Sequence, residues 1–132
     1  MTDRKTILVV DDMSQIRHIL RFSLKREGYR VVLAASGKEA LAYAFDPANP
    51  LDLVILDIMM PKMNGYEVIR RLKNSAVTRA VPVLFLTAKA QKKDVARGIA
   101  AGADDYALKP YKFSELHEKI KKLLPPGVPP AP

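Results

Sequence analysis

Residues 51–61, Leu-Asp-Leu-Val-Ile-Leu-Asp-Ile-Met-Met-Pro, contain the stretch that decides the fold. Residues 53–56 are apolar on both faces of an extended chain, which is typical of a parallel strand covered by helices above and below. Asp57 follows at the point where this strand ends and a turn begins. Because ligands of open α/β sheets bind at the carboxyl ends of the strands, Asp57 is the first candidate for a functional residue.

The length and composition of the chain bound what it can be. With 132 residues, 48% of them hydrophobic, it suits one globular domain with its own core. It has no cysteine, which excludes disulfides, thiol catalysis and zinc–thiolate sites. No segment approaches the roughly 20 apolar residues of a membrane span, and residues 1–5 lead straight into a strand without a signal-peptide core. We therefore expect a cytoplasmic protein without membrane contact.

The formal net charge of +8 raises the question of an acidic partner. The basic residues are scattered over the predicted helices, as they are on solvated faces. There is no helix-turn-helix signal and no basic strand interleaved with aromatic residues. The sequence therefore argues against direct nucleic-acid binding, and acidic proteins are the favoured partners.

Apolar strand patterns alternate with helical patterns five times along the chain. Strands are predicted at 6–10, 30–34, 51–57, 81–87 and 106–108. Helices are predicted at 14–27 and 37–45, from about 65 with its inner face at 68, 69 and 72, and at 91–101 and 112–124. This alternation predicts a parallel sheet with helices on both faces. Half of the chain's ten prolines lie in residues 125–132, so we interpret residues 1–124 as the domain and the rest as a Pro-rich tail or truncated linker.

Polar residues mark the starts of three of these helices. Ser14 and Asn64 are predicted N-caps, and Ser36 with Glu39 forms a capping box. The strand at 30–34 is less apolar at its start than the others, which predicts a place at an edge of the sheet.

Four of the predicted strands end in residues that could do chemistry: Asp11 with Asp12, Asp57, Thr87 and Lys109. Each alone is more often a cap, a turn former or a solvated side chain, but parallel strands bring all of them to one edge. Three clustered carboxylates repel one another unless protons or a cation intervene, and hard oxygen ligands without His or Cys favour Mg²⁺. With a lysine and a hydroxyl for phosphoryl oxygens, this set suits phosphoryl transfer onto a carboxylate.

The sequence motifs around these residues resemble the receiver domain of two-component response regulators, the CheY-like family. The resemblance covers residues 5–124 and rests on residues 9–12, 56–61 with 64–67, 86–88, and 102–106 with 108–110. It implies a flavodoxin-like (βα)5 three-layer sandwich whose parallel sheet has the strand order 2-1-3-4-5.

The resemblance also implies a phosphorelay role. Asp57 would accept a phosphoryl group from a phosphohistidine of a sensor histidine kinase or a histidine phosphotransfer protein. Asp12 and Asp57 would bind Mg²⁺ directly, together with the backbone carbonyl of Met59, while Asp11 would act through a metal-bound water. Such a domain catalyses only its own phosphorylation and dephosphorylation and is not otherwise an enzyme.

Further roles follow from the same resemblance. Thr87 and Lys109 would bind phosphoryl oxygens, and the small Ala88 would leave room for the phosphodonor. Tyr106 would be the switch residue that moves inward when Thr87 moves toward the phosphate. The peptide bond from Lys109 to Pro110 would be cis.

Two positions that vary across the family tune the lifetime of the phosphoryl group, and here they are Met59 and Lys89. Neither side chain can act as a base toward a hydrolytic water. We therefore predict slow self-dephosphorylation.

The output surface implied by the resemblance comprises the helix from residue 91, the fifth strand and the last helix. The mixed charges there suit a symmetric homodimer and equally suit an ordinary solvated face. These charged residues are Lys92, Lys93, Arg97, Asp104, Asp105, Glu115, Glu118, Lys119, Lys121 and Lys122. The downstream partner is an effector protein or an output domain outside this sequence.

The helix that begins near Ser14 has Arg17, Arg21 and Lys25 on its predicted wet side, and family analogy makes it the kinase-docking surface. His18 and His117 are predicted on helix surfaces, without neighbours at metal-ligand spacing.

Three alternatives differ in testable features. An aspartyl-nucleophile phosphohydrolase usually has a second Asp two residues after the first, where this chain has Met59. A flavodoxin-like FMN carrier needs a Ser/Thr/Gly-rich phosphate loop where Asp11 and Asp12 stand. A pseudo-receiver that binds partners without phosphorylation would lack an acidic residue or the lysine, and none is missing here.

Overall fold

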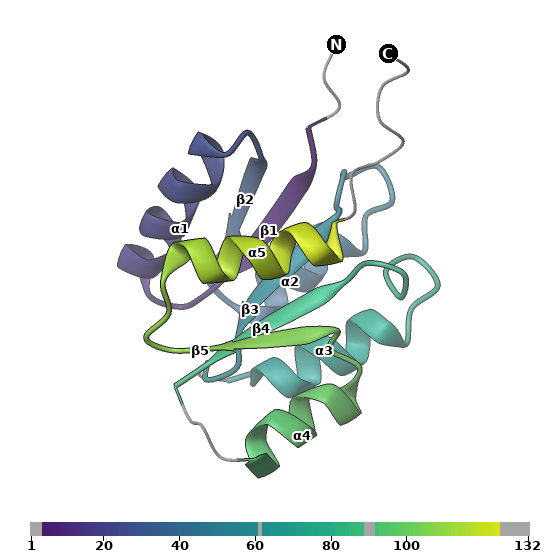
Figure 1. Ribbon diagram of the computed structural model, residues 1–132. Helices are drawn as coiled ribbons and strands as arrows, with labels where there is room; N and C mark the ends of the chain where they lie inside the picture. The colour runs from purple at the N-terminus through teal and green to yellow at the C-terminus, as the bar shows by residue number, and fades with distance from the viewer. Residues whose placement is uncertain (1–3, 61, 89–91, 125–132) are drawn as a thin grey trace.

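The computed structural model of the protein describes residues 4–60, 62–88 and 92–124. Strands and helices alternate along the chain (Figure 1), as the sequence patterns predict. They are β1 (Thr6–Val10), α1 (Ser14–Arg26), β2 (Arg30–Ala34), α2 (Gly37–Ala44), β3 (Leu53–Asp57), α3 (Gly65–Lys73), β4 (Val83–Thr87), α4 (Lys92–Ala101), β5 (Asp105–Leu108) and α5 (Phe113–Leu123). The predictions that concern Lys89 and residues 125–132 lie outside the described residues.

The strands form one five-stranded parallel sheet in the order β2-β1-β3-β4-β5. This confirms the predicted order and the edge position of β2. All strands run in one direction, so their carboxyl ends meet at one edge. The pairing of β1 with both β2 and β3 ends at Val10, and β3 pairs with β4 as far as Asp57.

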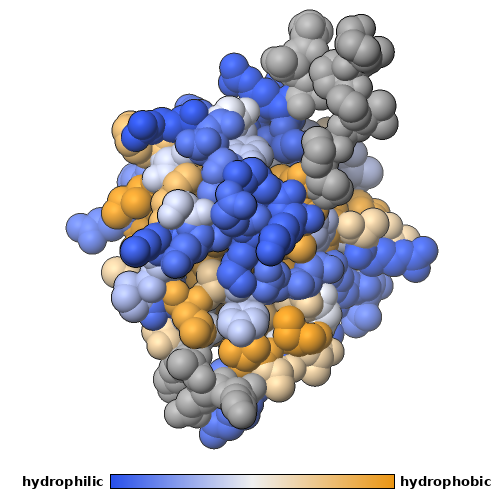
Figure 2. Space-filling model, in the orientation of Figure 1, coloured by the Kyte–Doolittle hydropathy of each residue, from blue (hydrophilic) through white to orange (hydrophobic). Residues whose placement is uncertain are grey.

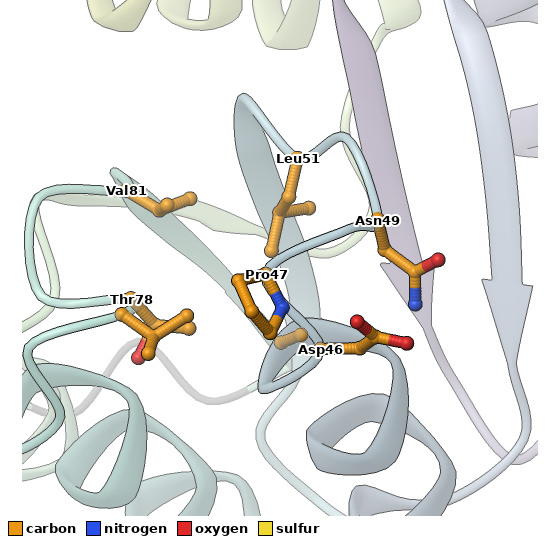
Figure 3. A pocket seen from close by; sticks show the side chains of 8 residues that line it. Asp46, Pro47, Asn49, Leu51, Thr78 and Val81 are labelled. Carbon is orange, nitrogen blue, oxygen red and sulfur yellow. The ribbon is translucent and has the colours of Figure 1, made fainter.

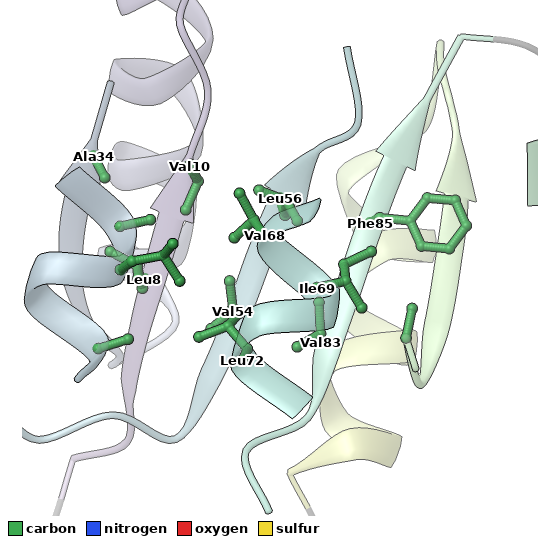
Figure 4. Packing of buried hydrophobic residues seen from close by; sticks show 14 of the residues in the cluster. Leu8, Val10, Ala34, Val54, Leu56, Val68, Ile69, Leu72, Val83 and Phe85 are labelled. Atoms are coloured by element: carbon green, nitrogen blue, oxygen red, sulfur yellow. The ribbon is translucent and has the colours of Figure 1, made fainter. Parts of the chain in front are cut away.

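Two apolar layers lie on opposite faces of the sheet because alternate strand residues point to opposite sides. One layer packs Leu8, Val54 and Phe85 against α2 and α3 (Figure 4). The other packs Ile7 and Ile55 against α1 and α5. Burial of both faces explains why the central strands are continuous apolar runs, as expected of a parallel sheet.

Two predicted N-caps are present. The hydroxyl of Ser36 accepts a hydrogen bond from the N–H of Glu39 at 3.1 Å, and the Asn64 side chain accepts one from the N–H of Glu67 at 3.0 Å. The Glu39 carboxylate reaches back to the N–H of Ala35 at 2.9 Å, one residue beyond the bond of a standard capping box.

The predicted cap at Ser14 is wrong. Ser14 is the first residue of α1, and the N-cap is Met13, whose side chain makes no capping bond. The N–H of Met13 instead donates to Oδ1 of Asp11 at 2.9 Å. The turn before α1 is therefore organised around a carboxylate of the strand end rather than around a hydroxyl.

His117 does not lie on an open helix surface as predicted. Its ring stacks on Phe113 with 5.6 Å between centroids, and its Nε2 lies 3.1 Å from the Tyr29 hydroxyl. Its Nδ1 lies 3.7 Å from a carboxylate oxygen of Glu27. His117 thus joins α5 to the chain at the end of α1.

The helices differ in what they present to solvent. Hydrophilic side chains gather over α5 in the view of Figure 2, whereas α1 exposes two large apolar residues, Ile19 and Phe22. Among the described helices, none is long and apolar enough to span a membrane.

Candidate functional site

Asp57 lies at the carboxyl end of β3, where the sequence places it. The residue is 5% exposed, and its Oδ1 accepts a hydrogen bond from the N–H of Met59 at 3.1 Å. The next residue, Ile58, donates its N–H to Leu86 of β4 and accepts a bond from the N–H of Gly65 at the start of α3. Strand pairing and a helix start thus fix the backbone that carries the carboxylate.

Asp11 and Asp12 follow β1 on the neighbouring strand. The N–H of Asp11 donates to the carbonyl of Ala34 at 3.1 Å, which continues the contact with β2 past the end of the ladder. Asp11 is 1% exposed, whereas Asp12 is exposed. One oxygen from each of Asp11, Asp12 and Asp57 lies within 4.8 Å of the others, so the structure brings the three predicted carboxylates together.

The surroundings of Asp11 favour its protonated form. Burial raises the pKa of this carboxyl above its usual value, and the charges of Asp57 and Asp12 raise it further. The Met13 N–H and the Lys109 ammonium lower the pKa but do not cancel the effect of burial. Oδ2 of Asp11 is buried and makes no hydrogen bond within the described residues.

These features fit a bound divalent cation. Unpaired buried carboxylate oxygen is costly, and a cation beside three carboxylates would remove that cost. The donor set consists of hard oxygen atoms, which suits Mg²⁺ rather than a softer transition metal.

Lys109 enters the same site from the end of β5. Its Nζ lies 3.4 Å from Oδ2 of Asp57 and 4.0 Å from Oδ2 of Asp11. Its backbone N–H donates to the carbonyl of Thr87 at 2.8 Å, which ties the ends of β4 and β5 together. The peptide bond between Lys109 and Pro110 is cis.

The other predicted site residues lie on β4 and β5. Thr87 is buried at the end of β4, and Ala88 is exposed directly after it. Tyr106 of β5 stacks on the buried ring of Phe85 with centroids 5.9 Å apart. The ammonium of Lys119 lies 5.2 Å from the centroid of the Tyr106 ring. Tyr106 also lines a hollow of about 320 Å³ between β5 and α5.

Two neighbours of the site were missed by the sequence analysis. Arg17, predicted on the wet side of α1, donates from Nη1 to the backbone carbonyl of Asp11 at 2.7 Å. Tyr111 is half-buried, and its pKa is raised by burial and then by the charges of Asp11 and Asp57. The sequence offered one sign that Arg17 belongs to the site: it is a basic residue near the start of a helix whose first turn has no acidic residue. For Tyr111 the sequence offered no such sign.

A second hollow, of about 240 Å³, lies near the start of β3, at the opposite edge of the sheet (Figure 3). Its polar lining is already hydrogen-bonded: the Asn49 amide donates to the carbonyl of Tyr43, and the Thr78 hydroxyl donates to that of Leu72. We therefore place the functional site at the Asp57 edge.

Comparisons of the sequence with known proteins identify the family of the chain. Residues 7–121 match the profile of the response regulator receiver domain. The chain is 42% identical over 120 residues to the alkaline phosphatase synthesis transcriptional regulatory protein PhoP of Bacillus subtilis, covering 91% of this chain and 48% of PhoP. It is 39% identical over 118 residues to the response regulator SaeR of Staphylococcus aureus, covering 89% and 50%. The chain thus spans about half the length of these relatives.

Solved structures show the same fold. The chemotaxis protein CheY4 of Vibrio cholerae matches with a TM-score of 0.84 at 31% identity, covering 91% of this chain and 98% of CheY4. The response regulator TrrA of Thermotoga maritima, solved in complex with Mg²⁺ and BeF, matches with a TM-score of 0.79 at 40% identity, covering 90% and 98%. The chain therefore belongs to the response regulator receiver domains, the phosphorelay signalling modules of two-component systems.

Proposed function

We propose that this receiver accepts a phosphoryl group on Asp57 from a phosphohistidine of a sensor histidine kinase or a histidine phosphotransfer protein. One observation carries the proposal: a nearly buried carboxylate at a strand end is surrounded by two further carboxylates and a lysine ammonium 3.4 Å away. A structural aspartate needs neither the like charges nor the lysine, whereas phosphoryl transfer needs both a cation site and a positive group.

The transfer requires only rearrangement at phosphorus. An oxygen of Asp57 forms a bond to phosphorus as the bond from phosphorus to the histidine nitrogen breaks, and that nitrogen keeps the electron pair. Lys109 is placed to pair with a phosphoryl oxygen in place of the Asp57 oxygen that it contacts now. Ala88 is exposed directly after Thr87, and its small side chain leaves the approach to the site open to a phosphodonor.

The residues that would hold Mg²⁺ are Asp12 and Asp57, with the backbone carbonyl of Met59, and with Asp11 acting through a bound water. When bound, the ion would neutralise the charge of the carboxylates and of the incoming phosphoryl group. Asp11 would then keep its proton less tightly, because the cation favours the ionised carboxylate.

The proposed switch links the site to the surface of β5. Thr87 would bind a phosphoryl oxygen through its hydroxyl, and Tyr106 would follow into the space that Thr87 leaves. The two residues lie on paired strands, with the Tyr106 ring already stacked on Phe85 of the strand that carries Thr87.

We expect the phosphoryl group on Asp57 to be lost slowly. Met59 is 62% exposed at the rim of the site and has no group that can take a proton from water. The other position predicted to tune the phosphoryl lifetime, Lys89, lies outside the described residues. If the phosphorylated protein lost its phosphoryl group with a half-life of seconds after removal of the phosphodonor, this expectation would be wrong.

The proposed partners follow from family membership and surface composition. The kinase-docking surface is α1, which combines exposed Ile19 and Phe22 with basic residues. The output surface is α4, β5 and α5, where a second copy of the chain would bind after phosphorylation. In this proposal residues 1–124 act as the receiver, residues 125–132 are a Pro-rich tail or linker, and the domain works in the cytoplasm as a signalling module rather than as an enzyme.

The decisive test is the intact mass of the protein after incubation with Mg²⁺ and acetyl phosphate. We expect the wild type to gain one phosphoryl group and Asp57→Asn to gain none. Asp46→Asn is the matched control, because Asp46 is exposed at the far edge of the sheet and should leave the gain unchanged.

The alternatives give different results in the same experiment. A pseudo-receiver would gain no mass with any donor, even if Mg²⁺ binds. An aspartyl phosphohydrolase would release phosphate over many turnovers from added phosphomonoesters. Equal phosphorylation of Asp57→Asn would show that another residue is the acceptor and that the proposal is wrong.

A further inference from the structure

Arg17 is the contact at the site that neither the sequence analysis nor the proposed function explains. It lies in the second turn of α1, and its Nη1 reaches back 2.7 Å to the carbonyl oxygen of Asp11. This is a short, charge-assisted hydrogen bond across six residues. It ends on the backbone of the residue that begins the acidic cluster.

The Arg17 contact gives a hydrogen-bond donor to a backbone carbonyl that lies beyond the strand pairing of the sheet. The ladder of β1 ends at Val10, so the Asp11 carbonyl lies past the last strand pair. The N–H of Asp11 is bonded to Ala34, and its Oδ1 is bonded to the N–H of Met13. With Arg17 on the carbonyl, Asp11 is fixed at three points, and Oδ2 is the oxygen left without a hydrogen bond within the described residues.

The position of Arg17 costs stability in α1 itself. A cation that points back toward a helix N-terminus opposes the helix dipole and destabilises the helix. The first turn of α1 has no acidic residue and no side-chain cap to offset this cost. A local rule broken beside a functional site indicates that the residue serves the site.

We propose that Arg17 is a positioning residue that holds the turn between β1 and α1 in the shape that lets Asp11 and Asp12 take a divalent cation. This inference rests on the proposed Mg²⁺ site. Arg17 touches neither the cation nor the phosphoryl group and acts only through the Asp11 backbone.

The test is the Mg²⁺ affinity of the unphosphorylated protein, measured by titration of backbone amide NMR shifts. Loss of a group that supports metal ligands typically weakens binding by 10–100-fold, so we expect Arg17→Met to weaken Mg²⁺ binding by about tenfold. Arg21→Met is the matched control, because Arg21 lies one turn later on α1 and is exposed. It removes the same charge and should not weaken binding.

The sign of the effect separates positioning from charge. Loss of a positive charge near a cation site tightens cation binding by electrostatics alone. Weaker binding in Arg17→Met therefore requires a change in the shape of the turn. Arg17→Lys keeps the charge and one donor and should recover part of the affinity, although it lacks the planar fork of arginine.

Unfolding by urea in EDTA provides the readout for a merely structural role. If Arg17→Met and Arg17→Lys bind Mg²⁺ as tightly as the wild type, or lose stability without losing affinity, the positioning role is wrong while the Mg²⁺ site stands. If the wild type binds no Mg²⁺, the proposed site fails and this inference fails with it.

Discussion

At the scale of single residues, the site is a compromise between function and stability. Asp11 is buried among like charges, so its ionised form destabilises the folded protein. Its carboxyl pKa is raised on folding, which means that the folded state holds the proton more tightly than the unfolded state. The contribution of Asp11 to stability is therefore most favourable below the usual pKa of 3.8 and becomes less favourable as the pH rises through the folded-state pKa.

Asp11→Asn should remove this loss. We expect the variant to be more stable than the wild type at pH 7 in EDTA, with a gap that closes as the pH falls below 3.8, where the wild-type carboxyl becomes protonated in both states. A gain of 1 kcal/mol would raise the Tm by about 4 °C in a domain of this size. Thermal unfolding at several pH values measures the gap.

Addition of Mg²⁺ should make the wild type more stable than Asp11→Asn. The cation binds the folded wild type and stabilises it by mass action, whereas the variant has lost one of the carboxylates. A variant that is less stable than the wild type in EDTA at pH 7 would show that the ionised Asp11 is not a burden on the fold.

At the scale of elements, the contact of α3 with the end of β3 sets the position of the acceptor. Gly65 is the first residue of α3, and a Cβ there would lie 2.6 Å from Cα of Ile58 and 2.9 Å from the carbonyl oxygen of Asp57. Both atoms are backbone, so the helix or the strand end must move. We expect Gly65→Ala to cost about 1–3 kcal/mol of stability and to slow phosphorylation.

Gly37 offers a matched control for this substitution. It is the first residue of α2 and follows a capping serine, but a Cβ there would meet only side chains, 2.7 Å from Cγ2 of Val68 and 3.0 Å from Sδ of Met63. Met63 is flexible, and a side chain shifts at lower cost than strand and helix backbone, so Gly37→Ala should cost less than Gly65→Ala. Urea unfolding and the rate of mass gain with acetyl phosphate measure both effects. Equal rates in Gly65→Ala and wild type would contradict the close-contact account.

A lysine connects three elements at the edge opposite the site. Nζ of Lys73, at the end of α3, donates to the carbonyls of Arg79 and Val81 and to Oδ2 of Asp104 at 2.9 Å. Its side chain is only 18% exposed. Because hydrogen bonds to charged groups contribute about 1.5–3 kcal/mol, we expect Lys73→Met to lower the free energy of unfolding by about 2 kcal/mol.

The comparison variant is Lys121→Met on α5. Lys121 pairs with Glu118 at 2.6 Å, but both side chains are more than half exposed. Exposed pairs contribute little to stability because solvent screens them, so this substitution should be nearly neutral. Similar losses for the two variants in urea unfolding would show that burial does not distinguish the two pairs.

At the scale of the whole molecule, the sequence was sufficient for the sheet and for the placement of the site. Continuous apolar runs and polar strand ends can be recognised in a single sequence because each is a pattern of residues that are neighbours in the chain. Arg17 and His117 were placed wrongly on solvated faces, and the pairing of Asp104 was not predicted, because their partners are set by packing. The Tyr29 partner of His117 lies 88 residues away in sequence, and the Lys73 partner of Asp104 lies 31 residues away.

The charges of the output surface are also partly paired within the chain. Asp105 accepts from Lys119 at 3.3 Å, and the same ammonium lies against the Tyr106 ring. Ile99 and Leu108 are exposed large apolar residues on α4 and β5. We expect a dimer through this surface to exchange the Asp105–Lys119 pair between copies while it buries Ile99 and Leu108.

This exchange makes the proposed dimer testable by sedimentation. We expect the unphosphorylated protein, with its net charge of +8, to be a monomer and the phosphorylated protein to dimerise. Lys119→Glu should stay monomeric, and the double variant Asp105→Lys with Lys119→Glu should dimerise again because the pair is restored in reverse. Lys25→Glu on α1 carries the same charge change and should behave as wild type.

Salt gives an independent measure of the same interface. The Debye length, over which charges interact in solution, falls from about 8 Å at 0.15 M salt to about 3 Å at 1 M. An interface that depends on the Asp105–Lys119 pair should therefore weaken as the salt concentration is raised. An interface held mainly by Ile99 and Leu108 should keep its affinity or strengthen. A phosphorylated protein that stays monomeric at every salt concentration would favour the ordinary solvated face, and the receiver would then signal to a partner of a different kind.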